Sequence, residues 1–115
     1  MSTIRVLLAG LTALLFILTL PRLARAADDS AQIYKVRCAA CHGVDGYADT
    51  PMARKQNIHS FASAAVQKKS TDELADCILN GGKERRASHT FATKGLSVEQ
   101  GASLAAYVRQ LGRHK

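Results

Sequence analysis

The chain has 115 residues, of which 47% are hydrophobic, and its formal net charge is +7. This length allows one small domain at most, and no basic run is interleaved with aromatic residues, which excludes the usual single-strand nucleic-acid binders. Aromatic residues are scarce, with three Phe, three Tyr and no Trp. A chain this small has difficulty burying a core, so we expect a disulfide, a metal or a large apolar cofactor to stabilise it.

The N-terminus has the pattern of a secretory leader. Arg5 precedes an apolar run of 15 residues, Val6 to Leu20, and Pro21 breaks that run. The sequence ARA at residues 24–26 supplies a small-x-small cleavage signal. The apolar run is shorter than the ~20 residues that a helix needs to span a bilayer. We therefore expect cleavage after Ala26, with an uncleaved membrane anchor as the alternative.

The predicted domains are a signal peptide at residues 1–26 and an exported, periplasmic domain at residues 27–115. Without the leader the chain keeps 13 basic and 9 acidic residues, a net charge of +4. This mildly basic balance favours an acidic partner surface and stays well short of a nucleic-acid-binding composition. No membrane span is expected once the leader is removed.

The first helix of the mature domain is expected from about residue 30 to residue 40. The segment Asp28–Ser30 supplies N-terminal capping residues, and Gly43 ends the helix. A long loop follows at roughly residues 43–69, without a convincing strand pattern. A compact domain rarely carries so long a loop without a reason, and wrapping around a bulky cofactor is one such reason.

The second helix is expected from about residue 71 to residue 80. Ser70 and Glu73 form a capping box, and the two glycines at 81–82 are a stop signal. Cys77 lies on the apolar stripe of this helix, where a free cysteine behaves as a small buried hydrophobe. Because the chain has three cysteines, an odd number, intermolecular pairing of Cys77 is the alternative.

The third helix is expected from about residue 98 to residue 111. Ser97 and Gln100 form a second capping box. The apolar stripe at spacing i, i+3, i+4 and i+7 consists of Leu104, Tyr107, Val108 and Leu111. Gly101 lowers the stability of the first turn. A close crossing by another helix would explain this glycine, and a simply tolerated residue is the alternative.

The motif CAACH, Cys38 to His42, closes the first helix and is compatible with three chemistries. A structural zinc site usually needs a second ligand pair, and the chain has no second C-x-x-C and no H-x-x-x-H. A redox disulfide of this type opens a helix after a strand, whereas this motif ends a helix. The third chemistry is covalent haem attachment, for which C-x-x-C-H is the signature.

The spacing of the motif suits haem attachment. Cys38 and Cys41 are three residues apart near a helix end, so they share a face and both thiols can reach two vinyl groups on one edge of a porphyrin. His42 then projects beneath the ring, where an imidazole can bind iron. In an exported chain, the motif favours haem over zinc and over a redox disulfide.

Three stretches together resemble the bacterial class I c-type cytochromes, small monohaem cytochrome c domains. They are AQIYKVRCAACHGVDGYADTPMA, STDELADCILNGG and GLSVEQGASLAAYVRQL. The resemblance covers residues 30–112 and implies an all-α fold of three main helices, with long loops wrapped around one covalent haem c. It makes Cys38 and Cys41 the thioether cysteines and His42 the proximal iron ligand. It also places Tyr34 and Tyr107 near the crossing of the first and last helices, where both could equally be plain core residues.

The segment after the middle helix departs from this family. The family's distal ligand is typically a methionine that lies a few residues after the glycine ending that helix. Phe91 aligns with the phenylalanine of the family motif, Thr90 replaces its proline, and His89 stands where the methionine would be. We therefore expect His89 to be the second iron ligand. Met52 and His59 are its rivals, and a five-coordinate or water-bound iron is a further alternative.

These residues predict a bis-histidine haem of low reduction potential. Met/His ligation raises the potential of a cytochrome c, and replacing the thioether by a more strongly donating imidazole stabilises the ferric state. The implied function is periplasmic electron transfer by a protein that is not an enzyme. The alternatives are a haem-based sensor, an electron-donor subunit of a dehydrogenase or oxidase, and a zinc-stabilised interaction domain.

The expected partners are redox proteins. Docking is expected through a basic surface that consists of Lys83, Arg85, Arg86 and Lys94. Cations near an exposed haem edge steer an acidic partner. The alternatives are that these side chains are merely solvated or that some of them pair with haem propionates.

Overall fold

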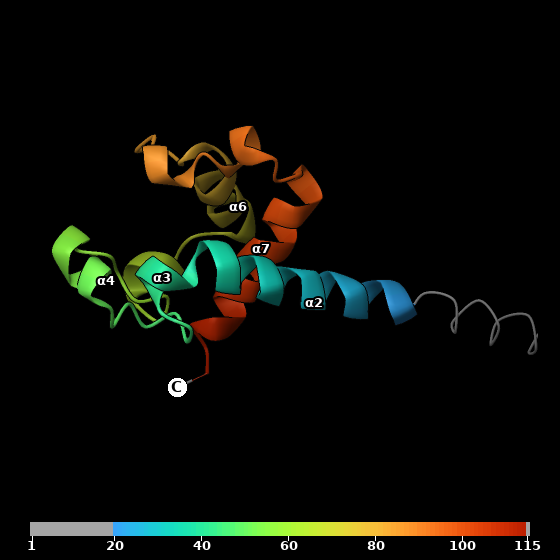
Figure 1. The fold of residues 1–115 in the computed structure, drawn as a ribbon, viewed down its shortest axis with the longest axis horizontal. Coiled ribbons are helices and arrows are strands. Elements are labelled where there is room, and N and C mark those ends of the chain that lie inside the picture. Colours follow the sequence, from blue (N-terminus) through green and yellow to red (C-terminus); the bar gives the residue numbers. More distant parts are fainter. Residues whose placement is uncertain (1–19, 115) are drawn as a thin grey trace, which may run out of the picture.

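The computed structural model describes residues 20–114, with side chains from Asp29 onward. Most of the expected signal peptide, residues 1–19, lies outside the described residues. Between residues 20 and 114 the fold is all-α, as expected, and contains no strand (Figure 1). The elements are α2 (Leu20–Arg37), α3 (Ala39–His42), α4 (Pro51–Gln56), α5 (Ala64–Gln67), α6 (Thr71–Asn80) and α7 (Val98–Leu111), with two 3-10 turns, η1 (Ala87–His89) and η2 (Phe91–Lys94).

The first helical segment is longer and less regular than expected. α2 already includes Leu20, so the expected start near residue 30 is wrong, and the segment Asp28–Ser30 lies inside the helix instead of capping it. Leucine, alanine and arginine dominate residues 20–27, and these strong helix formers favour the extension. A break at Cys38, with φ −121° and ψ −38°, then separates α2 from α3. Gly43 ends α3 as predicted, with a φ of 81°.

The segment 43–69 was expected to be a loop, and that prediction is wrong for two short helices within it. Thr50 caps α4, because its Oγ1 accepts a hydrogen bond from the Ala53 N–H at 2.9 Å. Pro51 occupies the first helical position, where its missing N–H costs nothing and its fixed φ favours a helix. α5 follows Ser63 and forms only a single turn.

The predictions of α6 and α7 are confirmed at both ends. In α6 the Ser70 Oγ accepts from the Glu73 N–H at 3.1 Å, and the Ser70 N–H donates to the Glu73 Oε2 at 2.8 Å. Ser97 and Gln100 form the same reciprocal pair at the start of α7, at 3.1 and 2.9 Å. These capping boxes satisfy N–H groups that a helix terminus leaves without a partner, so the two ends form where the sequence indicated.

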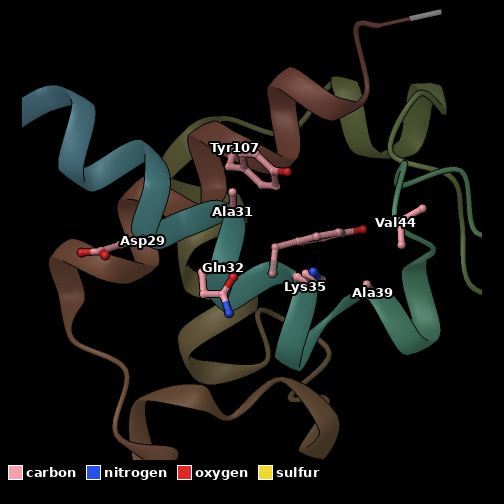
Figure 2. Close-up of a pocket in the computed structure, with 8 residues that line it drawn as sticks. Asp29, Ala31, Gln32, Lys35, Ala39, Val44 and Tyr107 are labelled. Atoms are coloured by element: carbon pink, nitrogen blue, oxygen red, sulfur yellow. The ribbon is translucent and has the colours of Figure 1, made fainter.

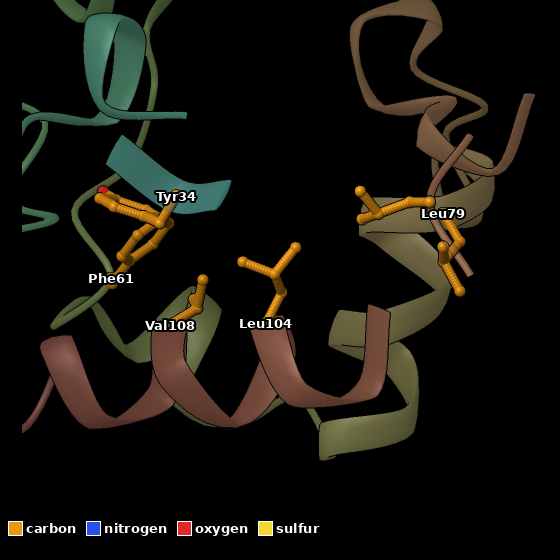
Figure 3. Packing of buried hydrophobic residues seen from close by; sticks show 6 residues of the cluster. Tyr34, Phe61, Leu79, Leu104 and Val108 are labelled. Carbon is orange, nitrogen blue, oxygen red and sulfur yellow. The ribbon is translucent and has the colours of Figure 1, made fainter. Parts of the chain in front are cut away.

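The hydrophobic core lies where α7 packs against both α2 and α6. Figure 3 shows Tyr34 of α2 and Phe61 next to Val108 of α7, with Leu104 of α7 beside them and Leu79 of α6 to one side. The buried members are Tyr34, Phe61, Leu79, Leu96, Leu104 and Val108. Leu104 is 1% exposed, and burying such a side chain contributes about 1.5–3 kcal/mol. Two of these six residues, Leu104 and Val108, lie on α7, so this helix is central to the core.

Gly101 marks a close crossing between α6 and α7. A Cβ added at Gly101 would lie 2.5 Å from the Leu79 Cδ1 and 2.6 Å from the Leu79 Cγ. Leu79 is itself buried, so it cannot turn into solvent to make room. Of the two readings of this glycine, the structure therefore supports the close crossing.

We expect Gly101→Val to destabilise the protein by about 2 kcal/mol or more, because overpacking a filled core forces off-rotamer side chains and backbone shifts. The matched control is Ala106→Val on the exposed face of α7, which should cost only the difference in helix propensity, below ~1 kcal/mol. Denaturant unfolding measures both. Equal losses in the two variants would contradict the close-crossing explanation.

Candidate cofactor site

The two cysteines and the histidine of the CAACH motif lie within one turn of chain. Cys38 is at the junction of α2 and α3, and Cys41 and His42 belong to α3. The Cys41 and His42 N–H groups both donate to the Cys38 carbonyl, at 3.1 and 3.0 Å. All three side chains are half-buried. Burial raises the pKa of Cys38 to about 11, so this residue is a neutral thiol at neutral pH.

Side chains from outside the motif fix the turn that follows it. The Tyr34 hydroxyl donates to the Gly43 carbonyl at 2.6 Å, and the Thr50 hydroxyl donates to the Cys41 carbonyl at 2.7 Å. Tyr34 is 1% exposed, and its ring lies 5.5 Å from that of Tyr107. The tyrosines therefore pack at the α2–α7 crossing as expected, and Tyr34 is also a core residue. Burial raises the pKa of Tyr34 well above its usual value, so its hydroxyl stays a donor.

His42 presents a neutral, oriented imidazole. Its ring stacks on that of Phe61, with centroids 4.8 Å apart and an interplanar angle of 27°. Burial, helped by the charges of His89 and Arg86, lowers the pKa of His42 to about 4. The ring therefore keeps a free lone pair at neutral pH, as a metal ligand requires. Its Nδ1 is buried and has no hydrogen-bond partner among the described residues.

His89 faces His42 although the two residues are 47 positions apart in the sequence. Their ring centroids are 5.8 Å apart and the rings are 18° from parallel. Burial lowers the pKa of His89, and the charges of Arg86 and Lys94 lower it further, so this imidazole is also neutral. The structure thus places two neutral imidazoles next to each other, one from the motif and one from η1.

A tight return of the chain after α6 carries His89 to this position. Gly81 ends α6 with a φ of 87°, and the Arg86 N–H donates back to its carbonyl at 3.2 Å. The His89 N–H in turn donates to the Arg86 carbonyl at 2.9 Å. A Cβ at Gly81 would lie 2.5 Å from the Arg86 N and 2.8 Å from the Arg86 O. Because these are backbone atoms, only glycine fits this return.

The two rivals of His89 have other surroundings. Met52 is on α4 with 40% of its surface exposed, and its Sδ accepts a hydrogen bond from the Gln56 Nε2 at 3.0 Å. His59 is exposed in the segment between α4 and α5. Of the three candidate ligands, His89 is the one whose ring contacts His42.

Two residues at the site escaped the sequence analysis. Phe61 stacks on His42, and the only local hint was an aromatic residue inside a polar loop. Cys77 places its Sγ 3.9 Å from the His89 Nδ1, whereas the sequence indicated only a buried position for it. Neither contact follows from local spacing, because each joins segments that are brought together by the fold.

The comparison with known protein families decides the identity of the chain. The family model described as Cytochrome c matches residues 27–112. The chain belongs to the cytochrome c family. Searches among curated proteins and among solved structures gave no significant match. Membership confirms the resemblance to class I c-type cytochromes. The cytochrome therefore binds one covalent haem c with its iron and transfers electrons with redox partner proteins.

The donor groups of the candidate site fit a haem better than a structural zinc ion. Two thiols lie in one turn, and two neutral imidazoles lie beside them, one with a buried Nδ1 that lacks a partner. Zinc takes four protein ligands in a structural site. Within residues 20–114, no group of three or more His, Cys, Asp or Glu side chains could hold a metal ion. Two protein ligands suffice for haem iron, because the porphyrin supplies the others.

Two of the four cations of the expected basic surface are paired with acids. The Lys83 Nζ lies 4.0 Å from the Glu73 Oε1, and the Arg86 guanidinium forms an ion pair with Glu84. All four of these side chains are exposed, so the pairs add little stability. They nevertheless reduce the positive charge that this part of the surface presents to a partner.

A third cation, from α2, lies near one of the two remaining cations. Arg85 and Lys94 are exposed, and no ion pair joins either of them to another described residue. The Lys94 Nζ lies 4.9 Å above the Phe91 ring. The Arg37 guanidinium donates to the Lys94 carbonyl at 3.2 Å. Arg37, which was not among the cations expected from the sequence, is the residue directly before Cys38 and therefore adds a further cation beside Lys94.

An open pocket near the α2–α7 crossing borders the candidate site, because Tyr34, and Ala39 of the CAACH motif, are among its lining residues. Figure 2 shows side chains of α2 and α7 around it. Its lining residues are Asp29, Ala31, Gln32, Tyr34, Lys35, Ala39, Val44 and Tyr107. None of the two motif cysteines, His42 or His89 lines this pocket.

We expect Gly81→Ala to cost at least about 2 kcal/mol of stability and to displace His89, because left-handed strain of ~1–2 kcal/mol adds to a clash with backbone atoms. Gly95→Ala is the matched control, since Gly95 also has a φ of 87° but nothing lies within 4 Å of its added Cβ. Denaturant unfolding and the NMR shifts of the His89 ring measure the effects. Indistinguishable variants would contradict this account of the return.

Proposed function

We propose that this cytochrome is an exported periplasmic electron carrier that holds its haem between His42 and His89. In this assignment, Cys38 and Cys41 would hold the haem through two thioether bonds, and His42 and His89 would be the two protein ligands of its iron. The observation that carries the proposal is the pair of neutral rings with centroids 5.8 Å apart. One ring belongs to the attachment motif, and the other stands where the family has its distal methionine.

When bound, the haem supplies a one-electron change of its iron. The chain contributes binding and orientation. Phe61 fixes the plane of the His42 ring through a 4.8 Å stack. The Tyr34 and Thr50 hydroxyls donate to the Gly43 and Cys41 carbonyls and so hold the end of the motif and the turn after it. Because burial keeps both imidazoles neutral, neither needs to lose a proton before it binds iron.

A low reduction potential follows from this ligand pair. Methionine as the second ligand raises the potential of a cytochrome c, and imidazole donates electron density more strongly than a thioether does. Two imidazoles therefore stabilise the ferric state. With both His42 and His89 as ligands, the iron would offer no open position to a substrate, which supports an electron carrier and not an enzyme. The haem-sensor alternative needs such an open position.

Export is proposed from the leader pattern. The family match begins at residue 27, directly after the expected cleavage site, which supports a signal peptide at residues 1–26 and a mature domain at residues 27–115. Within residues 20–114, no helix is both long and apolar enough to span a membrane. The periplasm is the compartment in which an exported bacterial protein with this motif would meet its partners.

Docking of an acidic redox partner is proposed through the exposed cations beside the site. Arg85, Lys94 and Arg37 lack acidic partners among the described residues, whereas Lys83 and Arg86 are paired. Unpaired cations attract an acidic surface over a distance of about 10 Å at 0.1 M salt. The proposed surface therefore differs from the sequence prediction by the addition of Arg37 and the weaker contribution of the two paired residues.

The ligand assignment predicts the effect of replacing His89. We expect the wild-type ferric protein to be low-spin without a methionine–iron charge-transfer band. We expect His89→Ala to lose the low-spin spectrum and to bind carbon monoxide when reduced. His89→Met should raise the potential by roughly 100 mV or more, within the ~0.8 V range that axial ligands span. Optical spectra and redox titration measure these changes.

His59→Ala and Met52→Leu are the controls, and both should leave the spectrum and the potential unchanged. A methionine charge-transfer band in the wild-type protein would contradict the assignment of His89. So would a low-spin spectrum that survives in His89→Ala. Rapid binding of carbon monoxide by the reduced wild-type protein would favour the sensor alternative.

The docking proposal predicts that electron transfer depends on charge. Reduction by a negatively charged iron chelate should slow by about tenfold between low and physiological salt, because salt screens the attraction. Arg85→Glu should slow the same reaction at low salt, and Arg113→Glu, an exposed charge reversal near the end of α7, should not. Stopped-flow rates at several ionic strengths, with a cationic reductant in parallel, test this. Rates that do not respond to salt would exclude steering.

A further inference from the structure

Cys77 and His89 are in contact across two segments of the fold. The Sγ of Cys77 lies 3.9 Å from the Nδ1 of His89, within the range of a hydrogen bond that involves sulfur. Cys77 comes from the last turn of α6 and His89 from η1. Both side chains are half-buried, so bulk water competes only in part for this contact.

The contact involves one specific nitrogen of the His89 ring. A neutral imidazole has one N–H donor and one nitrogen with a free lone pair, and the hydrogen bond of one nitrogen determines which role the other takes. With Nδ1–H directed at the Cys77 sulfur, the lone pair lies on Nε2. No hydrogen bond occupies His89 Nε2 among the described residues, so this nitrogen is free to bind iron.

The backbone around Cys77 holds its sulfur in place. The Gly81 N–H donates to the Cys77 carbonyl at 3.1 Å. Gly82 lies beside Cys77, and an added Cβ would be in ordinary contact with the Cys77 Cα at 3.4 Å. The same glycines start the return that delivers His89. The sulfur and the ring it meets are therefore both fixed by one feature, the end of α6.

His42 lacks a comparable partner. Its Nδ1 is buried without a hydrogen bond within the described part of the chain, and Phe61 orients its ring by stacking alone. Among the described residues, a side chain thus lies within hydrogen-bond range of the Nδ1 of His89 but not of the Nδ1 of His42. Partners that accept a hydrogen bond from a ligating histidine fix its tautomer and orientation and raise its basicity. Such a partner at His89 alone would therefore strengthen His89 as an iron ligand.

We propose that Cys77 is a positioning residue that accepts a hydrogen bond from the Nδ1–H of His89, and so directs the His89 Nε2 toward the iron and strengthens it as a ligand. This inference rests on the proposed role of His89 as the distal ligand. It gives Cys77 a function beyond that of the small buried hydrophobe indicated by the sequence. It also requires the thiol to be unmodified, and Cys77 is a free cysteine in the structure.

The test compares Cys77→Ala with Cys77→Ser in the haem-loaded protein. Both variants remove the sulfur and leave side chains of similar size, but only serine keeps an atom that can accept a hydrogen bond. We expect Cys77→Ala to shift the equilibrium between ferric and ferrous iron toward the ferrous form by up to about tenfold. This shift corresponds to a rise of about 59 mV in the reduction potential of a one-electron couple. We expect Cys77→Ser to stay close to the wild type in potential.

Electron paramagnetic resonance of the ferric protein provides a second readout, because its g-values report the orientation of the axial ligands. They should change in Cys77→Ala and return toward the wild type in Cys77→Ser. Ile78→Val is the matched control, since it trims the neighbouring half-buried residue and should lower stability while leaving potential and g-values unchanged. A purely packing role for Cys77 would reproduce this control pattern in both variants and would overturn the inference.

His89→Ala separates failure of this inference from failure of the proposed function. If His89→Ala leaves the low-spin spectrum intact, the ligand assignment itself is wrong and the role of Cys77 falls with it. If His89→Ala abolishes that spectrum while Cys77→Ala changes neither the potential nor the g-values, only the inference about Cys77 is wrong.

Discussion

The return of the chain at Gly81 is the constraint on which the rest of the site depends. A side chain at this position would meet the backbone of Arg86 at 2.5 Å, so the tight fold-back is open to glycine alone. It orders η1, brings His89 next to His42, and places the same ring against Cys77. One left-handed residue thus determines which side chain opposes the attachment motif.

The parts of the fold that were predictable from the sequence are those governed by local chemistry. The capping boxes at Ser70 and Ser97 each satisfy helix N–H groups within four residues, so α6 and α7 begin where the pattern indicated. The start of α2 was missed, because polar residues suited to a cap also lie inside a helix when strong helix formers precede them. The short helices α4 and α5 were missed because six and four residues carry too little periodicity to be recognised.

The residues of the candidate site also differ in whether local sequence predicts their position. Cys38, Cys41 and His42 lie within five residues of one another, so their spacing alone predicted that they lie together. His89 was accessible only through its place in a family resemblance, since nothing local distinguishes it from His59. The contacts of Phe61 and Cys77 depend on how α6 and the 43–69 segment pack, and no pattern along the chain encodes them. What the structure adds is therefore the surroundings of the imidazoles.

Those surroundings act on the reduction potential in opposite directions. In the proposed assignment, two imidazole ligands favour ferric iron, whereas the charges of Arg86 and Lys94, which also lower the pKa of His89, favour ferrous iron. The cations are exposed, and a charge that acts through water contributes only about 1 kcal/mol even at 4 Å, less than the 59 mV of a tenfold change. Arg86 is further neutralised by Glu84. Axial ligands shift haem potentials over ~0.8 V, so the ligand pair outweighs the nearby charge. The surface cations could therefore serve the proposed docking without raising the potential much, because their charges act on the iron through water.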